Sequence, residues 1–298
     1  MQNPKPLSVI EPDTAKETKL IFFDVDGTLL DSSGQFSDVL QQQLKRLRER
    51  GLSLAIASGR PPFACRFLFE QLGLVDTGLF YTGGLIYQPS SDKTFTRHSL
   101  ANDDARDLFY AARELGLYFE LYDSERFILD VAHQCAPHIT AEHSRQLRCE
   151  PEREVIETLL LRAEPEATKS GESPWIKVLL GEDARESDFL PQLEARFPEL
   201  HFAYAKLPSY PDWRFASVIP KAADKHLAFD RLLDHYQLAS HQVMAFGDAG
   251  SDKVFLQRAG VGVAMGSAVA DVQACADFLC PSSDEEGVAL ALASFFPE

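Results

Sequence analysis

Short apolar runs alternate with amphipathic segments near both ends of the chain, and this alternation limits the possible folds more than any other feature. Residues 19–25 (KLIFFDV) are mostly apolar and lead into turn residues, as expected of a strand buried on both faces. Runs of the same type follow at 52–57, 78–81, 243–246 and 261–264. Strands that alternate with helices predict an α/β fold, with a parallel Rossmann-like sheet and helices on both of its faces.

The segments between these strands carry helix signals. Residues 36–51 have one apolar stripe, with Ser37 placed to cap the start and Gly51 the end. Two prolines at a helix start mark a second such segment, residues 61–73. Further helices are predicted at 224–236, 251–260 and 267–275.

The middle of the chain has a different pattern. Its strands are more amphipathic and come in pairs, 117–124 with 126–132 and 200–207 with 212–219. Helical patterns at 103–115, 152–162 and 185–197 separate them, and the polar stretch 162–174 is typical of an exposed loop. We therefore predict that residues 87–218 form an inserted α+β domain with one open sheet face, and that residues 1–86 and 219–298 form the first domain.

Charge and composition limit the possible partners. The 29 lysines and arginines and 45 acidic residues among 298 give a net charge of −16, which disfavours nucleic acid and anionic membranes. An anionic substrate would need a local positive field. The chain has no apolar stretch long enough to span a bilayer, and its five cysteines form no C-x-x-C pair. We expect a cytoplasmic monomer or homodimer.

Acidic residues follow the first strand directly. Asp24 and Asp26 leave it at positions i and i+2, at the sheet edge where open α/β folds bind ligands. Neighbouring carboxylates repel each other unless a cation compensates, so the pair favours a divalent ion such as Mg²⁺. Gly27 permits a tight turn in which its N–H approaches an anion closely. The alternative is a solvated Asp-Gly turn.

The second and fourth strands also end in polar residues. Ser58 and Gly59 follow the second strand and can form an anion-binding cup at a helix start, although Ser-Gly at such a place is most often only a cap. Asp248 ends the fourth strand, and Asp252 comes one helical turn later, so both can point into one crevice. Lys225 is the candidate for the positive group.

Two alternatives remain at these positions. Lys221, four residues before Lys225, competes for the role of the positive group, and most lysines are simply solvated. The acidic pair after the fourth strand can equally be a loop residue and a partner for a helix dipole.

Taken in order, these motifs resemble those of the haloacid dehalogenase-like hydrolase superfamily, and within it the Cof-type phosphatases with a large type IIB cap. The resemblance rests on Asp-x-Asp-Gly-Thr at Asp24, the serine at Ser58, the lysine at Lys225, and Gly-Asp-x-x-x-Asp at Asp248. It covers residues 20–89 and about 219–292. It implies a Mg²⁺-dependent phosphatase that acts on a small phosphorylated metabolite, such as a sugar phosphate.

The resemblance also implies roles for single residues. Asp24 would be the nucleophile that forms an aspartyl-phosphate, and Asp26 the general acid and then base. Mg²⁺ would be bound by Asp24, Asp26 through its backbone carbonyl, and Asp248, with Asp252 close by. The residues implied to bind the phosphoryl oxygens and stabilise the transition state are Ser58, Gly59 and Lys225.

Three positions depart from the family pattern. Ser251 stands where asparagine is usual, the loop after the third strand reads Thr82-Gly83-Gly84, and His226 replaces a common glycine, where its ring could narrow the entrance. Alternatives are a phosphomutase, which needs a second phosphate site in the cap, and a catalytically weak protein that binds phospho-ligands. A receiver-like signalling domain fits less well, because the chain is more than twice as long. His133, His138 and His143 recur every five residues and cannot share one helix face.

Overall fold

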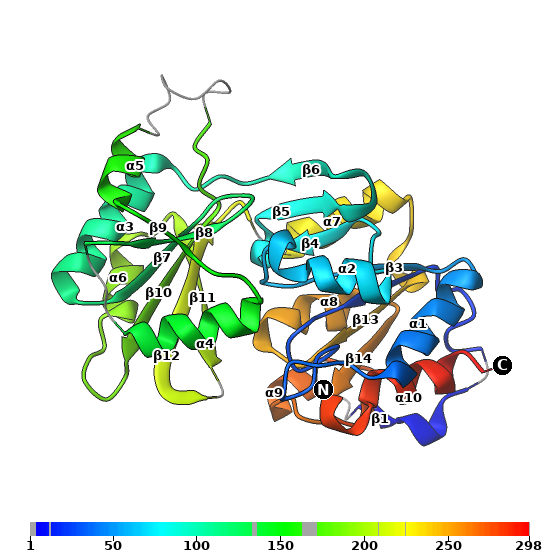
Figure 1. Ribbon diagram of the computed structural model, residues 1–298. Helices are drawn as coiled ribbons and strands as arrows, with labels where there is room; N and C mark the ends of the chain where they lie inside the picture. The colour runs from blue at the N-terminus through cyan, green and yellow to red at the C-terminus, as the bar shows by residue number, and fades with distance from the viewer. Residues whose placement is uncertain are drawn as a thin grey trace. The chain divides into compact units, whose positions relative to one another are not determined.

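The computed structural model describes residues 4–11, 13–132, 136–162, 172–207, 209–223 and 225–297. The chain divides into two compact units (Figure 1). The core unit comprises Met1–Arg60, Cys65–Phe95 and Asp224–Glu298, and the insert unit comprises Pro61–Ala64 and Thr96–Ala223. This division places residues 87–95 with the core unit, whereas the sequence pattern assigned them to the insertion.

The core unit contains a six-stranded parallel sheet. Its strand order is β1-β15-β14-β13-β2-β3, and every pair whose register is known is parallel. The predicted parallel Rossmann-like sheet is therefore confirmed. The strands are β1 (Lys5–Pro6), β2 (Leu20–Phe23), β3 (Ser53–Ile56), β13 (Val243–Gly247), β14 (Val261–Met265) and β15 (Phe278–Cys280).

Helices cover this sheet because its central strands are apolar on both faces. On one face, Phe22 of β2 and Phe229 of α7 both pack edge-to-face against Phe255 of α8. Helices α1 and α10 contact each other and the strands β3 and β15. The helices are α1 (Asp38–Glu49), α2 (Arg66–Leu72), α7 (Lys225–Tyr236), α8 (Lys253–Arg258), α9 (Ala270–Gln273) and α10 (Gly287–Phe295).

The predicted caps of the first helix are present, but the second helix begins later than predicted. The Ser37 hydroxyl accepts a hydrogen bond from the Leu40 N–H at 3.0 Å, and Gly51 follows α1 with a φ of 85°. Of the two prolines before α2, Pro62 begins the 3₁₀ turn Pro62–Cys65 and Pro61 precedes it, so neither lies in the α-helix itself.

One predicted strand belongs to a different sheet. Residues 78–81 were predicted as part of the parallel sheet, but β4 (Gly78–Phe80) forms a three-stranded sheet with β5 (Leu85–Gln88) and β6 (Lys93–Arg97). An isolated bridge between Ala57 and Leu79 connects β4 to the end of β3. The reason is that β4 is followed by a short turn, which favours an antiparallel partner over a crossover.

The insert unit contains a six-stranded sheet of order β11-β12-β10-β7-β8-β9. The predicted strand pairs β7–β8 and β11–β12 are present and antiparallel, while β8 and β9 are parallel. This agrees with the predicted α+β insertion. The strands are β7 (Tyr118–Tyr122), β8 (Phe127–Asp130), β9 (Glu152–Glu154), β10 (Lys177–Asp183), β11 (Leu200–Leu207) and β12 (Tyr210–Pro220).

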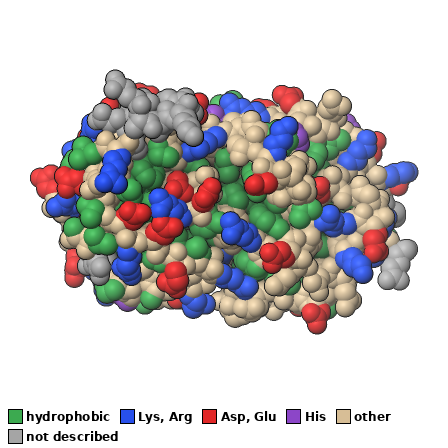
Figure 2. All heavy atoms as spheres, turned by 45° about the horizontal axis from the view of Figure 1, so that its top comes forward, with side chains coloured by type: hydrophobic (Ala, Val, Ile, Leu, Met, Phe, Trp, Pro, Cys, Tyr) green, Lys and Arg blue, Asp and Glu red, His purple; other side chains and the backbone are tan. Residues whose placement is uncertain are grey.

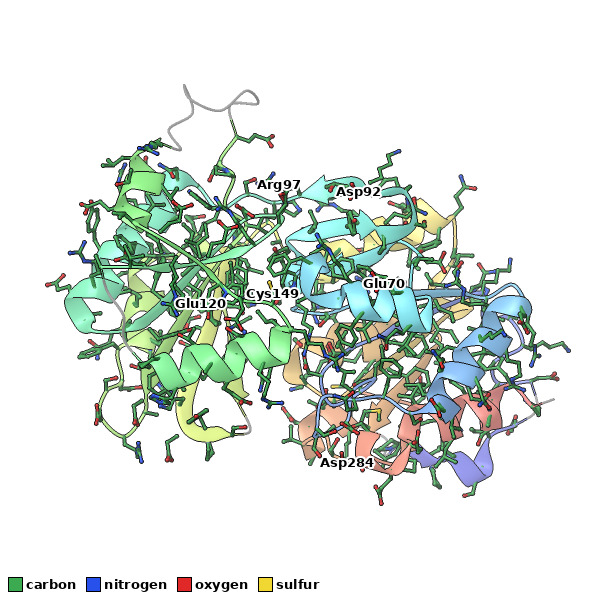
Figure 3. The ribbon with its side chains drawn as sticks, viewed as in Figure 1. Glu70, Asp92, Arg97, Glu120, Cys149 and Asp284 are labelled. Atoms are coloured by element: carbon green, nitrogen blue, oxygen red, sulfur yellow. The ribbon has the colours of Figure 1, made fainter. Side chains whose placement is uncertain are left out.

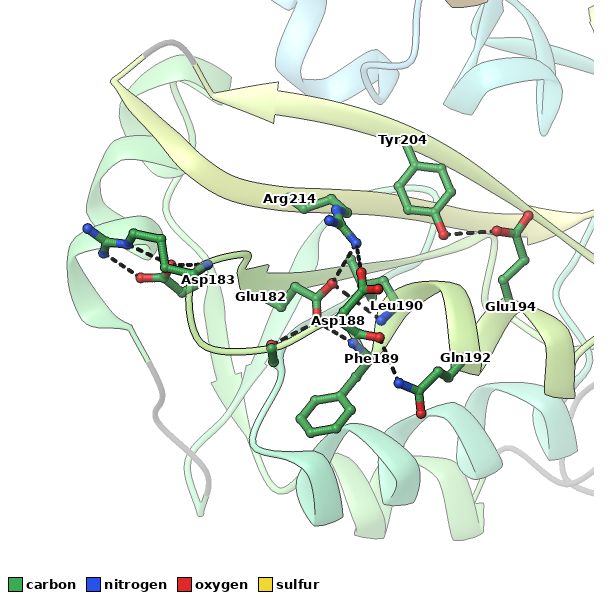
Figure 4. A network of polar contacts seen from close by, with 11 residues as sticks. Glu182, Asp183, Asp188, Phe189, Leu190, Gln192, Glu194, Tyr204 and Arg214 are labelled. Atoms are coloured by element: carbon green, nitrogen blue, oxygen red, sulfur yellow. Dashed lines mark hydrogen bonds and ion pairs between the residues drawn. The ribbon is translucent and has the colours of Figure 1, made fainter.

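Two helices of this unit are shorter than predicted. In the predicted helix 152–162, the first residues form strand β9 instead, because they pair with β8, and α5 begins only at Ile156. In the predicted helix 185–197, α6 begins at Leu190 because the Glu182 carboxylate accepts the Phe189 N–H at 2.7 Å and the Leu190 N–H at 3.4 Å (Figure 4). The helices are α3 (Asn102–Leu115), α4 (Pro137–Leu147), α5 (Ile156–Arg162) and α6 (Leu190–Arg196). The predicted loop 162–174 lies mostly outside the described residues.

The prediction of an open sheet face is wrong at β7 and β10. Helix α4, which the sequence pattern did not predict, lies on this face, where its Thr140 hydroxyl is 3.2 Å from the Tyr118 hydroxyl. Tyr118, Glu120 and Lys177 are at most 5% exposed. Glu120 is labelled in Figure 3. It accepts hydrogen bonds from the hydroxyls of Tyr118 and Tyr122, and bonds to His143 Nδ1 of α4 at 2.9 Å. Burial alone would raise the pKa of Glu120, but these partners lower it below its usual value.

The three histidines were expected not to share one helix face, and the structure describes two of them. His138 lies against the rings of Tyr210 and Trp213, whereas His143 binds Glu120. His133 lies outside the described residues.

Lys177 lies beside Glu120, and burial of its charge lowers the free energy of unfolding. Its Nζ is 4.3 Å from the centre of the Tyr122 ring, and burial lowers its pKa to about 8 although Glu120 opposes the shift. Since the usual pKa is 10.5, the unfolded chain binds more protons than the folded chain between about pH 8 and pH 10.5. The contribution of Lys177 to stability therefore rises with pH across this window.

Replacing Lys177 with methionine is expected to increase the free energy of unfolding by about 3 kcal/mol near neutral pH, because the buried charge is removed. Urea denaturation at pH values below and above the window measures the effect, and the difference between the two proteins should narrow at the higher pH. Leu179→Met on the same strand is the control. A variant that is less stable than the wild type at neutral pH would contradict this interpretation.

Surface charges show no separation into one acidic and one basic region on the face drawn in Figure 2, where the two kinds are interspersed. Exposed pairs such as Lys16–Asp13 are each worth less than about 1 kcal/mol. Among the described residues, the helices are too short or too polar to cross a membrane.

Candidate active site

The central strands β2 and β13 bring two acidic segments to one edge of the core sheet. The strands are parallel neighbours, with Phe23 opposite Phe246. The Asp24 N–H donates to the Phe246 carbonyl at 3.0 Å, so the pairing continues one residue beyond β2. Because β2 and β13 both end at this edge, Asp24 and Asp248 lie side by side.

Three carboxylates meet at this edge. One oxygen each from Asp24, Asp248 and Asp252 lie within 4.8 Å of one another. Asp252 is held in place, since its Oδ2 accepts the N–H groups of Asp248 at 3.2 Å and Ala249 at 2.9 Å. Its Oδ1 accepts from Lys225 Nζ at 3.2 Å and from the Ser251 hydroxyl at 3.2 Å.

The cluster carries more negative charge than its protein surroundings compensate. Burial, followed by the charges of Asp252 and Asp248, raises the pKa of Asp24, and Lys225 only partly opposes this. Burial and the Asp252 charge also raise the pKa of Asp248 to about 7. The buried Asp248 Oδ1 has no hydrogen-bond partner among the described residues. Three oxygen donors and an unused lone pair fit a hard divalent cation.

Gly27 allows the turn after β2 to pass close to this cluster. Its φ is +75°, and a Cβ at this position would lie 2.4 Å from Asp248 Oδ2. Glycine is therefore required both by the left-handed conformation and by the close approach of the carboxylate.

Gly27→Ala is expected to lower turnover about 100-fold, because the new methyl group must displace the Asp248 carboxylate. Gly34→Ala is a matched control: Gly34 has a similar φ of +74°, but nothing lies within 4 Å of its Cβ position. Both variants should lose similar stability by thermal denaturation, and only the first should lose activity. Equal activity in the two variants would show that Gly27 does not support the cluster.

Ser58 and Gly59 lie at the end of the neighbouring strand β3. The Ala57 N–H donates to the Phe23 carbonyl at 2.9 Å, which keeps this strand end beside β2. The buried Ser58 hydroxyl accepts from the Arg60 N–H at 3.3 Å. Thr82, one of the departures from the family pattern, donates its N–H to the Ser58 carbonyl at 3.2 Å, and its hydroxyl lies 3.1 Å from the Cβ position of Gly59.

Lys225 is the lysine whose ammonium group lies at the cluster. It begins helix α7 and is 93% buried, whereas Lys221 is exposed. An ammonium group this deeply buried needs a carboxylate partner, which Asp252 provides. His226, the next residue, is exposed, and its predicted effect on the entrance stays a prediction.

Asp26 has a different environment from the other three carboxylates. Its side chain is 60% exposed and forms a bidentate pair with Arg60, with distances of 2.7 Å from Nε and 2.6 Å from Nη2. The sequence analysis assigned no role to Arg60, which directly follows Ser58 and Gly59. The available signal was charge: an arginine directly after a strand end faces an acidic edge.

Comparisons with known proteins agree with this geometry. Residues 21–292 match the family of haloacid dehalogenase-like hydrolases. The chain belongs to this family. The match confirms the predicted family and the predicted enzyme class, a phosphatase of the haloacid dehalogenase-like type.

Two curated relatives from Bacillus subtilis match over almost their whole length. The chain is 25% identical to the 5-amino-6-(5-phospho-D-ribitylamino)uracil phosphatase YitU of Bacillus subtilis, over 94% of this chain and 99% of that protein. It is 27% identical to the phosphatase YwpJ of the same organism, over 91% and 97% of the two chains.

Solved structures show the same fold. A haloacid dehalogenase-like hydrolase from Bacteroides thetaiotaomicron is 27% identical and superposes with a TM-score of 0.78, covering 94% of this chain and all of that one. A structure described as a subclass IIB sugar phosphatase of the superfamily has a TM-score of 0.76 at 22% identity, covering 93% and 99%. At that identity the likeness concerns the fold alone.

Proposed function

We propose that this protein is a Mg²⁺-dependent phosphomonoesterase that hydrolyses a small phosphorylated metabolite through an aspartyl-phosphate on Asp24. In this proposal, residues 1–86 and 219–298 carry the catalytic machinery, and residues 87–218 form the cap that selects the substrate. The observation that carries the proposal is the convergence of Asp24, Asp248 and Asp252 within 4.8 Å, with Lys225 bonded to Asp252.

The first step transfers the phosphoryl group to the protein. A carboxylate oxygen of Asp24 attacks phosphorus, and the bond from phosphorus to the ester oxygen breaks. Asp26 gives a proton to the departing oxygen, so the leaving group departs as an alcohol. In the second step Asp26 takes a proton from water, which attacks the same phosphorus, and inorganic phosphate is released as the Asp24 carboxylate is restored.

Charge stabilisation comes from groups fixed before substrate binds. Lys225, Ser58 and the N–H groups of Gly59 and Gly27 are the candidates for binding the phosphoryl oxygens, and the loss of one donor is expected to cost about 3 kcal/mol. Mg²⁺ would be held by Asp24, the Asp26 backbone carbonyl and Asp248, with Asp252 nearby. When bound, the ion supplies positive charge that offsets the carboxylates and the phosphoryl group.

The substrate class is inferred from the relatives. YitU and a second relative from Bacillus subtilis are named for a phosphorylated ribityl compound. A sugar phosphate or a similar small phosphate ester is therefore proposed here, with flavin nucleotides and pyridoxal phosphate as further candidates.

Arginines of the insert unit argue against a phosphomutase. A mutase needs a second phosphate site in the cap, but three of the arginines in this unit are engaged by carboxylates. Arg126 pairs with Asp123, Glu152 and Glu154, Arg113 with Glu157, and Arg145 with Glu142.

A screen of phosphorylated metabolites tests the proposal. The purified protein should release phosphate from sugar phosphates and related small esters when Mg²⁺ is present, and sugar monophosphates should be hydrolysed rather than isomerised. Release from no compound in the panel, including p-nitrophenyl phosphate, would contradict the proposed activity.

A further inference from the structure

Arg60 is deeply buried although its charge is directed at an exposed partner. The arginine side chain is only 6% exposed, whereas the Asp26 side chain that it binds is 60% exposed. Most arginines lie at the surface, and burying one is unfavourable unless it is paired. Burial by itself would lower the pKa of Arg60, but the charge and hydrogen bonds of Asp26 raise it above its usual value. The guanidinium group is therefore charged and depends on Asp26.

The backbone of Arg60 is fixed on both sides. Its N–H donates to the Ser58 hydroxyl at 3.3 Å, and its carbonyl accepts from the Tyr81 N–H at 3.1 Å. Cys65 is a further group near the guanidinium, and burial raises its pKa to about 12, so it remains a neutral thiol. Arg60 is thus a rigid cation that is hydrogen-bonded to the Asp26 carboxylate, while the charge of Asp24 acts on it more weakly.

Asp26, in contrast, has little else to hold it. None of its carboxylate hydrogen bonds to described residues involves a group other than Arg60, and it is not one of the three clustered carboxylates. An exposed aspartate on a turn would otherwise sample several rotamers. Two parallel N–H···O bonds define both the position and the plane of a carboxylate, which a single-point contact cannot do.

We propose that Arg60 is the positioning residue for Asp26, and that it keeps this carboxylate at the place from which it exchanges a proton with the leaving oxygen of the substrate. The inference rests on the proposed function, in which Asp26 is the general acid. Arg60 acts through Asp26 and forms no bond with phosphorus. Its buried Nη1, which has no partner among the described residues, leaves a donor that the pair with Asp26 does not use.

Two esters with different leaving groups separate this role from a structural one. p-Nitrophenolate leaves phosphorus readily without a proton, whereas the alkoxide of benzyl phosphate needs one. Arg60→Gln should therefore lower kcat/KM about 100-fold for benzyl phosphate and less than about 3-fold for p-nitrophenyl phosphate. Arg60→Lys, which keeps the charge but loses the bidentate geometry, should lower the benzyl phosphate value about 10-fold, and it serves if the glutamine variant does not fold.

A double variant tests whether Arg60 acts through Asp26. Asp26→Asn should show the same preference for p-nitrophenyl phosphate, and adding Arg60→Gln to it should change kcat/KM for benzyl phosphate by less than about twofold. Arg46→Gln is the control, because Arg46 is a half-buried arginine of the same unit that bonds to Gln43 and to the Phe296 carbonyl. It should alter the activity toward neither ester.

The outcomes distinguish the inference from the proposed function. If Arg60→Gln lowers kcat/KM equally for both esters, Arg60 has a structural role and the inference is wrong. The same holds if Arg60→Gln lowers kcat/KM further in the Asp26→Asn background. If Asp26→Asn discriminates between the esters and Arg60→Gln does not, the inference is also wrong while the proposed function stands. If neither variant discriminates, the acid role of Asp26 fails together with the inference.

Discussion

Asp24→Asn is expected to lower turnover about 10⁴-fold or more with every phosphate ester, because the amide oxygen is a poor nucleophile and no phosphoenzyme can form. The same substitution should stabilise the fold in the absence of metal. Asp24 is buried beside Asp248 and Asp252, which raises its pKa, so removing its charge relieves repulsion. Phosphate release and the midpoint of thermal unfolding measure the two effects.

A loss of activity together with unchanged or higher stability separates chemistry from folding. Asp24→Ala is the companion variant, because asparagine can deamidate back to aspartate and leave a trace of activity. Asp271→Asn, an exposed aspartate paired with Lys253, is the matched control and should behave as the wild type. Turnover by Asp24→Ala within tenfold of the wild type would exclude Asp24 as the nucleophile.

Removal of divalent metal with a chelator is expected to lower turnover about 10³-fold, and added Mg²⁺ should restore it. The physical reason is the crowding of three carboxylates within 4.8 Å, for which Lys225 provides the nearest protein cation. An ion that binds this folded arrangement and not the unfolded chain also stabilises the fold, so the thermal midpoint should rise with Mg²⁺ concentration.

Asp248→Asn tests where the ion binds. This variant should lose most of the Mg²⁺-dependent rise in thermal midpoint, whereas Asp271→Asn should retain it. An undiminished response in Asp248→Asn would place the ion elsewhere, and full activity in the presence of chelator would contradict a role for metal.

The parallel sheet was predictable because its strands are apolar on both faces, and little else in a protein has that pattern. The common position of the residues that follow β2, β3 and β13 was predictable as well, because parallel strands end at one edge of the sheet. The predictions for β4, β9 and α6 failed where tertiary contacts decide. Glu152–Glu154 form the strand β9 because they pair with β8. The side chain of Glu182 sets the start of α6.

Arg60 and Lys177 show what the sequence alone does not reveal. Both are buried cations, and nothing in the local pattern distinguishes them from solvated ones. The backbone of Arg60 bonds to Ser58 and Tyr81 while its side chain bonds to Asp26, and Lys177 is buried beside Glu120 on a sheet face that the amphipathic pattern marked as open. In both cases the charged partner, Asp26 or Glu120, is distant in the sequence.

Rapid acid quenching of the protein during turnover, followed by borohydride reduction and peptide mapping, tests the central claim most directly. Borohydride converts an aspartyl-phosphate to homoserine, so we predict homoserine at position 24 in samples that received substrate and none in samples without it. Homoserine at another position, or none at any position while phosphate is being released, would contradict the account.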